Sequence, residues 1–209
     1  MSEPGSAAAA GFVALADPCG MNIAGPNGET HIGGSQEWYE KRWHRMSGCG
    51  PVAASNLIWH MTGTKGAIVQ YRELMLAMFD CVTPGRYGVN TSAIFCDGIA
   101  RYCAKHGLSF APHALDVPAP HKKRPSTETA RDFIAAALKG DSPVAFLNLS
   151  NGSLGNLEAW HWVTIIALDT GTMLAEASDY GNKLELDISA WLKTSVLGGA
   201  FVCLSPTAQ

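Results

Sequence analysis

The chain has 209 residues, a formal net charge of −3, and 47% hydrophobic against 16% charged residues. This balance predicts a single globular domain with a substantial core and excludes a disordered chain. The negative net charge argues against a dedicated nucleic-acid binder. No stretch approaches the roughly 18 apolar residues of a membrane-spanning helix. We therefore expect neither nucleic acid nor a membrane as a partner.

The cysteines and the N-terminus indicate which kinds of protein this chain does not resemble. Six cysteines are scattered at 19, 49, 81, 96, 103 and 203 without a C-x-x-C pair. This pattern fits neither a zinc site nor a small disulfide scaffold, so we expect reduced thiols, no metal and no cofactor. The first residues lack the basic region and apolar core of a signal peptide, which predicts a cytoplasmic protein. Residues 1–34, rich in Gly, Asn and Pro, predict an irregular arm before one domain at 35–209.

The stretch Gly48-Cys49-Gly50-Pro51 opens a helical pattern that ends near Gly63. Pro51 suits the first helical turn, where its missing N–H costs nothing. Cys49 is therefore expected at a helix N-terminus, where the helix dipole and the unpaired N–H groups favour a thiolate. Gly48 and Gly50 carry no side chains, so a substrate backbone could approach the sulfur closely. Cys49 is a candidate nucleophile, and the alternative is a buried cysteine at a well-capped helix start.

Helical patterns come first along the chain and strand patterns later. Further helices are expected at 68–79, 91–106 and 126–140, with a proline-rich connector at 111–125. Strands are expected at 144–149, 160–168, 172–178, 183–187 and 200–204, with a short helix at 188–194. This order predicts an α+β fold in which a helical lobe, about 35–140, packs against an antiparallel sheet lobe, about 141–205. A cleft between two such lobes is a common place for a site.

His161 is the candidate base. It begins a predicted strand that ends at the turn Asp169-Thr170-Gly171. A three-residue hairpin loop ending in a left-handed glycine is a favoured geometry, and it would place His161 directly opposite Asp179. A buried ionisable pair on an apolar face is costly unless it has a partner or a task. Asp179 is therefore the candidate group that orients the base, and the alternative is a salt bridge at the rim of the sheet.

Three motifs together resemble the papain-like cysteine peptidase superfamily: Gly48-Cys49-Gly50-Pro51, His161-Trp162-Val163 and Ser178-Asp179-Tyr180-Gly181. They look closest to the bacterial branch similar to bacteriocin-leader (double-glycine) peptidases, over about residues 36–205. The resemblance implies a papain-like fold and a thiol hydrolase that cleaves peptide or isopeptide bonds in a peptide or protein substrate. It implies Cys49 as nucleophile, His161 as base and later acid, and Asp179 as orienting group. The candidate substrate-binding residues are Gly48, Gly50, Trp160 and Trp162.

One position departs from the pattern of the superfamily. Its members usually carry an oxyanion-hole glutamine about six residues before the cysteine, where this chain has Trp43. The nearest upstream glutamine is Gln36. The backbone N–H of Cys49 can supply one oxyanion donor. The candidates for the second donor are Gln36, the Trp43 indole and His44.

Three other functions are compatible with the same residues. An acyl- or peptidyl-transferase would use the same triad, with an amine or thiol in place of water at the second step. A non-catalytic peptide-binding module on this fold would have no need of an intact Cys, His and Asp. A metal site at Cys49, His161 and Asp179 would need a fourth ligand, for which the sequence offers no clear candidate.

Overall fold

The computed structural model describes residues 11–17 and 19–207. The elements are β1 (Phe12–Ala14), β2 (Asn22–Ala24), β3 (Thr30–Ile32), η1 (Gln36–Trp38), α1 (Arg42–Ser47), α2 (Cys49–Met61), β4 (Gly66–Ala67), α3 (Ile68–Val82), α4 (Ser92–His106), β5 (Phe110–Val117), η2 (His121–Lys123), α5 (Thr127–Lys139), β6 (Val144–Asn148), β7 (His161–Asp169), β8 (Leu174–Asp179), β9 (Asn182–Asp187), α6 (Ile188–Thr194) and β10 (Gly199–Pro206). Seven strands form one antiparallel sheet in the order β5-β10-β6-β7-β8-β9, with β1 also paired to β7. The expected α+β class is confirmed.

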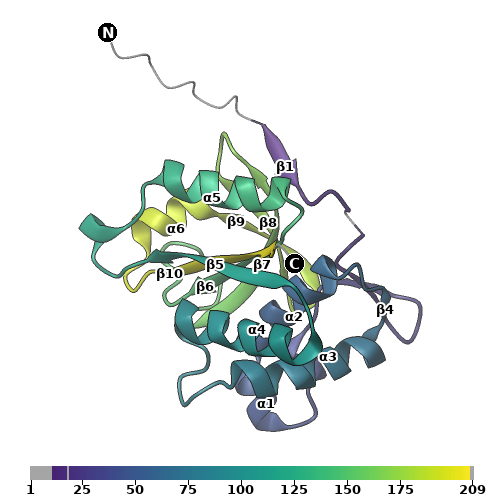
Figure 1. Cartoon of the computed structure of the whole chain (residues 1–209). Coiled ribbons are helices and arrows are strands. Elements are labelled where there is room, and N and C mark those ends of the chain that lie inside the picture. The colour runs from purple at the N-terminus through teal and green to yellow at the C-terminus, as the bar shows by residue number, and fades with distance from the viewer. Residues whose placement is uncertain (1–10, 18, 208–209) are drawn as a thin grey trace.

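Helices cover both faces of this sheet (Figure 1). In β6, Val144 and Phe146 pack into the cluster that holds α5 and α6, whereas Ala145 and Leu147 pack into the cluster that holds α2, α3 and α4. Successive side chains of a strand point to opposite faces, so this unbroken apolar run needs cover on both sides. The helices α2, α3 and α4 thus pack against one face of the antiparallel sheet, but α5 and α6 cover the other face, so the sheet is the middle of three layers and not one of two lobes.

The first part of the proline-rich segment after α4 is the strand β5, and only residues 118–125 remain as a connector. Residues of β5 pair with β10 along the whole length of the strand, and β5 lies at the edge of the sheet. Pro112 stands opposite Leu204 in this pairing. An edge strand tolerates proline because one side of it has no neighbour that needs the missing N–H. Pro112 therefore hides a strand that becomes apparent only through its pairing with β10 at the far end of the chain.

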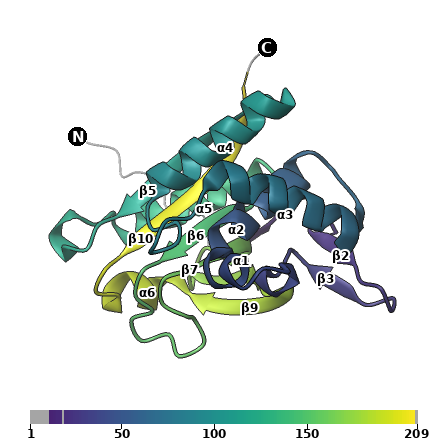
Figure 2. The ribbon, with the colours of Figure 1, turned by 90° about the horizontal axis from the view of Figure 1, so that it is seen from below.

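Residues 12–17 and 19–32 are part of the fold and not an irregular arm. β1 continues the edge of β7 that β6 occupies, because β1 pairs with residues 167–169 and β6 with residues 161–165. β2, β3 and β4 form a small second sheet, and Ile23 of β2 is fully buried. Figure 2 shows β2 and β3 beside α3. The first ten residues of the predicted arm lie outside the described residues.

The four longer predicted helices are all present. α4 begins where the Thr91 side chain accepts a hydrogen bond from Ile94 N and ends at Gly107, whose φ is 65°. α5 is capped by Ser126 through Thr129 N. α3 runs three residues beyond the predicted end, to Val82, and then stops at the left-handed Thr83. The short helix α1, directly before the cysteine, was not predicted because it carries only two turns of mixed aromatic and charged residues.

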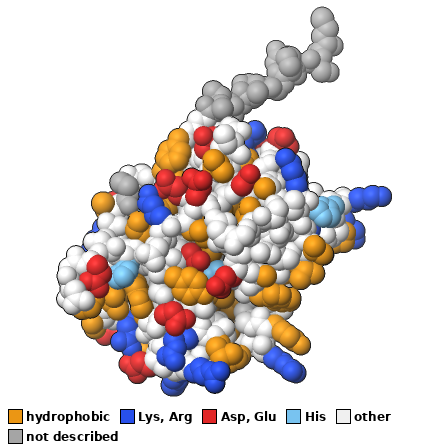
Figure 3. All heavy atoms as spheres, turned by 180° about the vertical axis from the view of Figure 1, so that it is seen from behind, with side chains coloured by type: hydrophobic (Ala, Val, Ile, Leu, Met, Phe, Trp, Pro, Cys, Tyr) orange, Lys and Arg blue, Asp and Glu red, His pale blue; other side chains and the backbone are white. Residues whose placement is uncertain are grey.

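The surface carries both signs of charge. In Figure 3, acidic and basic side chains are interspersed with hydrophobic ones on the face shown. The large hydrophobic side chains exposed among the described residues are Phe12, Trp43, Met46, Val69, Leu76, Tyr87, Trp160, Leu174, Val196 and Leu197. None of the described helices combines the length and the hydropathy needed to cross a membrane.

Candidate active site

Cys49 is the first residue of α2, as the sequence predicts, and its side chain is partly exposed. Gly48 caps the helix and Gly50 follows, but both glycines are buried. A Cβ on Gly50 would lie 2.8 Å from the Val89 side chain, and one on Gly48 would overlap the His44 carbonyl oxygen. The missing side chains are therefore used for close packing around the cysteine rather than for room at a substrate.

His161 and Asp179 form a hydrogen-bonded ion pair, with His161 Nε2 2.7 Å from Asp179 Oδ1. The imidazole is almost fully buried, and the side chain of Asp179 is 17% exposed. The two residues do not stand opposite each other. Thr164 pairs with Ser178 and Ile165 with Ala177, so the register is two residues away from the predicted one. The predicted contact is present, but the predicted direct pairing is wrong.

The turn between β7 and β8 explains the difference in register. Asp169 O accepts a hydrogen bond from Met173 N at 2.8 Å, and Met173, with φ 64°, is the left-handed residue. Gly171 is not left-handed. The Asp169 carboxylate holds the turn by accepting hydrogen bonds from the N–H groups of Gly171 and Thr172. Next to the turn, Ala167 pairs with Glu176, three residues away from the predicted register, and a bulge between Ile165 and Ala167 reduces the difference to two. The side chain of Asp169 thus belongs to the turn.

The electrostatics of His161 favour its charged form. Burial lowers the pKa of His161, but hydrogen bonds to Asp179 and to Cys49, together with the negative charges of both, outweigh it and raise the pKa to about 10. Because Nε2 is occupied by Asp179, Nδ1 is the nitrogen left for Cys49. The ring therefore joins the thiol at the start of α2 to the carboxylate at the end of β8.

Gln36 is the one oxyanion candidate that lies in the hollow with Cys49 and His161. Its Nε2 donates weakly to Tyr180 Oη at 3.4 Å, and its Oε1 is buried without a partner among the described residues. His44 instead stacks on Phe79, with ring centroids 4.0 Å apart. The helix α1 lies between Gln36 and the cysteine along the chain.

Tyr180 is a residue of the site that the sequence did not single out for a role. Its ring stacks on His161 with centroids 5.4 Å apart and planes 15° apart. Its hydroxyl donates to Glu158 Oε2 and accepts from Gln36. Its place directly after Asp179 was the only available signal. Tyr180 covers the His161–Asp179 pair from solvent and links it to Gln36.

A buried polar network lies beneath the site. Asn56 of α2 donates to Thr164 Oγ1 of β7 at 2.9 Å and accepts from Gly34 N at 2.9 Å. The hydroxyl of the fully buried Tyr71 also donates to Asn56. These bonds hold α2, β7 and the segment before Gln36 in one arrangement. The sequence carries no signal for them, because the partners are far apart along the chain.

Two hollows open at Cys49. One, of about 10 Å³, is lined by Gln36, Asn56, His161 and Asp179 and holds about one water-sized group. The other is a groove of about 500 Å³ lined by Trp43, Met46, Ser47, Cys49, Arg86, Tyr87, Gly88 and Trp160. Trp162 is buried, stacks on Phe95 and donates to Val89 O, so it belongs to the core. Of the two flanking tryptophans, Trp160 is the one that faces the groove.

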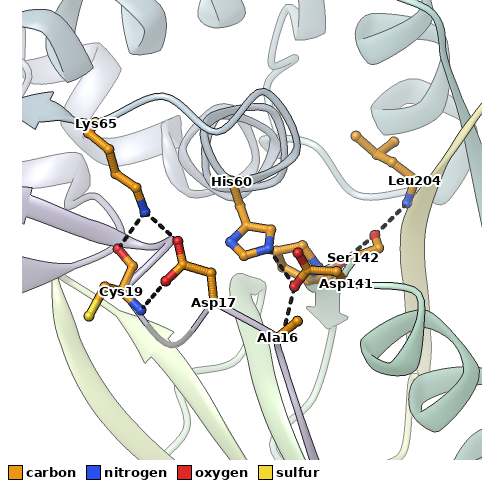
Figure 4. Close-up of polar contacts among 9 residues, drawn as sticks. Ala16, Asp17, Cys19, His60, Lys65, Asp141, Ser142 and Leu204 are labelled. Atoms are coloured by element: carbon orange, nitrogen blue, oxygen red, sulfur yellow. Dashed lines mark hydrogen bonds and ion pairs between the residues drawn. The ribbon is translucent and has the colours of Figure 1, made fainter.

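The opposite end of α2 is anchored by a second His–Asp pair (Figure 4). The buried His60 lies with Nε2 3.0 Å from Oδ1 of Asp141, which also accepts from Ala16 N at 2.8 Å. Lys65 nearby pairs with Asp17. This cluster ties α2 to the segment after β1 and to the turn after α5. The helix that carries Cys49 is therefore fixed at both ends.

No protein-family model matches the sequence, and neither does any curated protein. All six cysteines are free thiols. Within residues 11–17 and 19–207, no group of three or more His, Cys, Asp or Glu side chains is arranged to hold a metal ion.

Proposed function

We propose that this protein is a cysteine peptidase-like thiol hydrolase that cleaves peptide or isopeptide bonds through an acyl-enzyme. One observation carries the proposal: the buried imidazole of His161 bonds Asp179 at 2.7 Å and lines the same small hollow as Cys49, at the N-terminus of α2. A nucleophile, a base and a group that orients the base are the parts that nucleophilic catalysis needs. Their position beside an open groove gives a substrate access to the sulfur.

The first half of the reaction forms a thioester. The Cys49 thiolate attacks the carbonyl carbon of the scissile bond, and the negative charge moves to the carbonyl oxygen. The Cys49 N–H and Gln36 Nε2 are the proposed donors to that oxygen. When the carbon–nitrogen bond breaks, the His161 imidazolium gives its proton to the departing amine. Asp179 keeps the ring oriented and stabilises its positive charge before that transfer.

The second half of the reaction releases the acyl group. His161, now neutral, takes a proton from a water molecule, whose oxygen attacks the thioester carbon. The carbon–sulfur bond breaks, the acid leaves, and the thiolate–imidazolium pair is restored. An amine in place of water would give a transferase by the same steps.

The arrangement of elements also supports a papain-like fold. The helix that carries the cysteine packs against an antiparallel sheet, and the central strand β7 carries the histidine at its start. The aspartate ends the neighbouring strand β8. We propose this family on those positions together with the sequence motifs, and fold alone would not assign the activity.

A peptide-library digest read by mass spectrometry tests the proposed function. Wild type is compared with Cys49→Ala and with Cys19→Ala, which removes another solvent-exposed thiol and serves as the matched control. We expect cleavage by wild type and Cys19→Ala and none by Cys49→Ala. Cleavage by Cys49→Ala, or binding of peptides without cleavage by wild type, would overturn the proposal. Added amines that appear in the products would assign acyl transfer instead of hydrolysis.

A further inference from the structure

The groove beside Cys49 gathers exposed apolar side chains. Trp43 and Met46 on α1 are 46% and 66% exposed, and Tyr87 and Trp160 on two loops are 67% and 52% exposed. All four line the same groove as Cys49. Large apolar side chains that cluster at the surface usually mark a binding site, whereas single exposed apolar side chains are common and carry no such meaning. The groove is continuous with the nucleophile, so what it binds lies next to the reacting bond.

The two loops that form the walls hold their aromatic rings in place. Gly85 and Gly88 exchange backbone hydrogen bonds of 3.1 and 2.9 Å around Arg86 and Tyr87, and Gly88 is left-handed with φ 66°. The Tyr87 ring lies 6.4 Å from the Trp160 ring. Trp160 itself has φ 56°, a strained conformation for a bulky residue. Trp160 therefore lines the groove directly before His161, the first residue of β7.

The lining contains one charged side chain, Arg86, whose guanidinium carbon lies 5.9 Å from the centre of the Tyr87 ring. No carboxylate lines the groove among the described residues. Its volume of about 500 Å³ lies within the range of ~300–1,000 Å³ typical of ligand pockets. An apolar floor with aromatic walls gains most from a substrate group that is itself large and apolar.

From these observations, and resting on the proposed function, we infer that this groove is the specificity site of the enzyme. It binds a bulky apolar or aromatic side chain of the substrate next to the scissile bond. Trp43, Met46, Tyr87 and Trp160 contact that side chain, and Cys49 attacks the carbonyl beside it. Substrates with a small side chain at this position leave the groove empty and react slowly.

Alkylation of Cys49 separates this inference from the proposed function. Iodoacetamide and N-benzyl iodoacetamide carry the same reactive carbon, and in both reactions a sulfur–carbon bond forms while iodide leaves. Peptide mapping then gives the rate at Cys49 for each reagent. The iodoacetamide rate reports the reactivity of the thiol, and the ratio of the two rates reports the groove. We expect the benzyl reagent to react about tenfold faster or more, because its ring becomes buried.

Variants of the groove locate the effect. Tyr87→Ala and Met46→Ala should each lower the rate ratio about threefold or more, while the iodoacetamide rate stays near that of wild type. Phe12→Ala is the matched control, since Phe12 is an aromatic residue of similar exposure, 65%, on β1. It should leave the ratio unchanged. A reactive Cys49 with a ratio near one, or an equal loss in Phe12→Ala, would overturn the inference while leaving the proposed function intact.

Discussion

His161 Nε2 lies 2.7 Å from Asp179 Oδ1 although the two residues are not partners in the β7–β8 register. Ile165 pairs with Ala177, so Asp179 is a diagonal neighbour of His161 and not its opposite. Diagonal residues on one face remain within reach of long side chains. A slip of two residues keeps both side chains on the same face, whereas a slip of one residue would separate them. The His161–Asp179 pair therefore tolerates a shift in register by an even number of residues but not by an odd number.

Replacement of Asp179 tests the role of this pair. Asp179→Ala should lower kcat/KM on the order of 10³-fold, because the imidazolium loses its partner and the ring its orientation. Asp179→Asn keeps a hydrogen bond and should cost less. Asp169→Ala is the control, since its carboxylate bonds only the N–H groups of the β7–β8 turn. Steady-state kinetics on all three variants give these values of kcat/KM. A large loss in Asp169→Ala together with an unchanged kcat/KM in Asp179→Ala would refute the triad.

The pH profile should reflect the raised pKa of His161. The reactive form needs the imidazolium, and Asp179 and Cys49 raise the pKa of His161 to about 10 against burial, which lowers it. Activity should therefore persist above pH 7 and fall as the pH rises through about 10. In Asp179→Asn the carboxylate charge is lost, so the alkaline limb should move to lower pH. A limb that stays in place in this variant would contradict the assignment.

Gln36 should act in the transition state and not in binding. Gln36→Ala is expected to lower kcat by about 10²–10³-fold with little change in KM, the usual cost of a lost oxyanion donor. His44→Ala provides the comparison, because its ring packs on Phe79 and lies outside the hollow at Cys49. Rates measured on the folded fraction should stay near wild type for His44→Ala. A reversed ranking of the two variants would assign the donor to His44.

Asp141 should matter for stability and not for chemistry. Asp141→Ala removes the bonds to Ala16 N and His60 Nε2, and leaves a buried imidazole nitrogen unpaired. Urea unfolding should show a loss of about 1–3 kcal/mol. Asp132→Ala, which breaks only an exposed pair with Arg131, should cost no more than ~1 kcal/mol. The alkylation rate of Cys49 in folded Asp141→Ala should match wild type; a large fall would show that this anchor controls the nucleophile.

The fold was predictable where local signals are strong. The helical patterns at 68–79, 91–106 and 126–140 marked α3, α4 and α5, and apolar runs marked the sheet strands. The order of the layers was not predictable, because the apolar sequence of a strand such as β6 shows that both faces are covered but does not identify the helix that covers each face. The strands β1 and β5 depend on partners more than 80 residues away, Asp169 and Leu204 among them. Such pairing leaves no local pattern.

Within the candidate site, the sequence led to Cys49, His161 and Asp179, which the structure brings together. It did not choose among the oxyanion candidates, because Gln36 is separated from Cys49 by the whole of α1 along the chain and is brought beside it only by the fold. It assigned Trp162 to the substrate, whereas that side chain packs on Phe95. The groove is lined by α1, by the loop that carries Tyr87 and by the loop that carries Trp160. Only the three-dimensional arrangement shows that these segments meet.

The central claim is that Cys49 carries an acyl group during turnover. The protein is mixed with an activated ester of the peptide that it cleaves best in the library digest, and the reaction is quenched in acid. The acyl group on the protein is then detected by its intact mass. We predict a mass increase equal to the acyl group, located on the peptide that contains Cys49, present in wild type and Cys19→Ala and absent in Cys49→Ala. Turnover of the same ester by Cys49→Ala at the wild-type rate, with no adduct on wild type, would contradict the account.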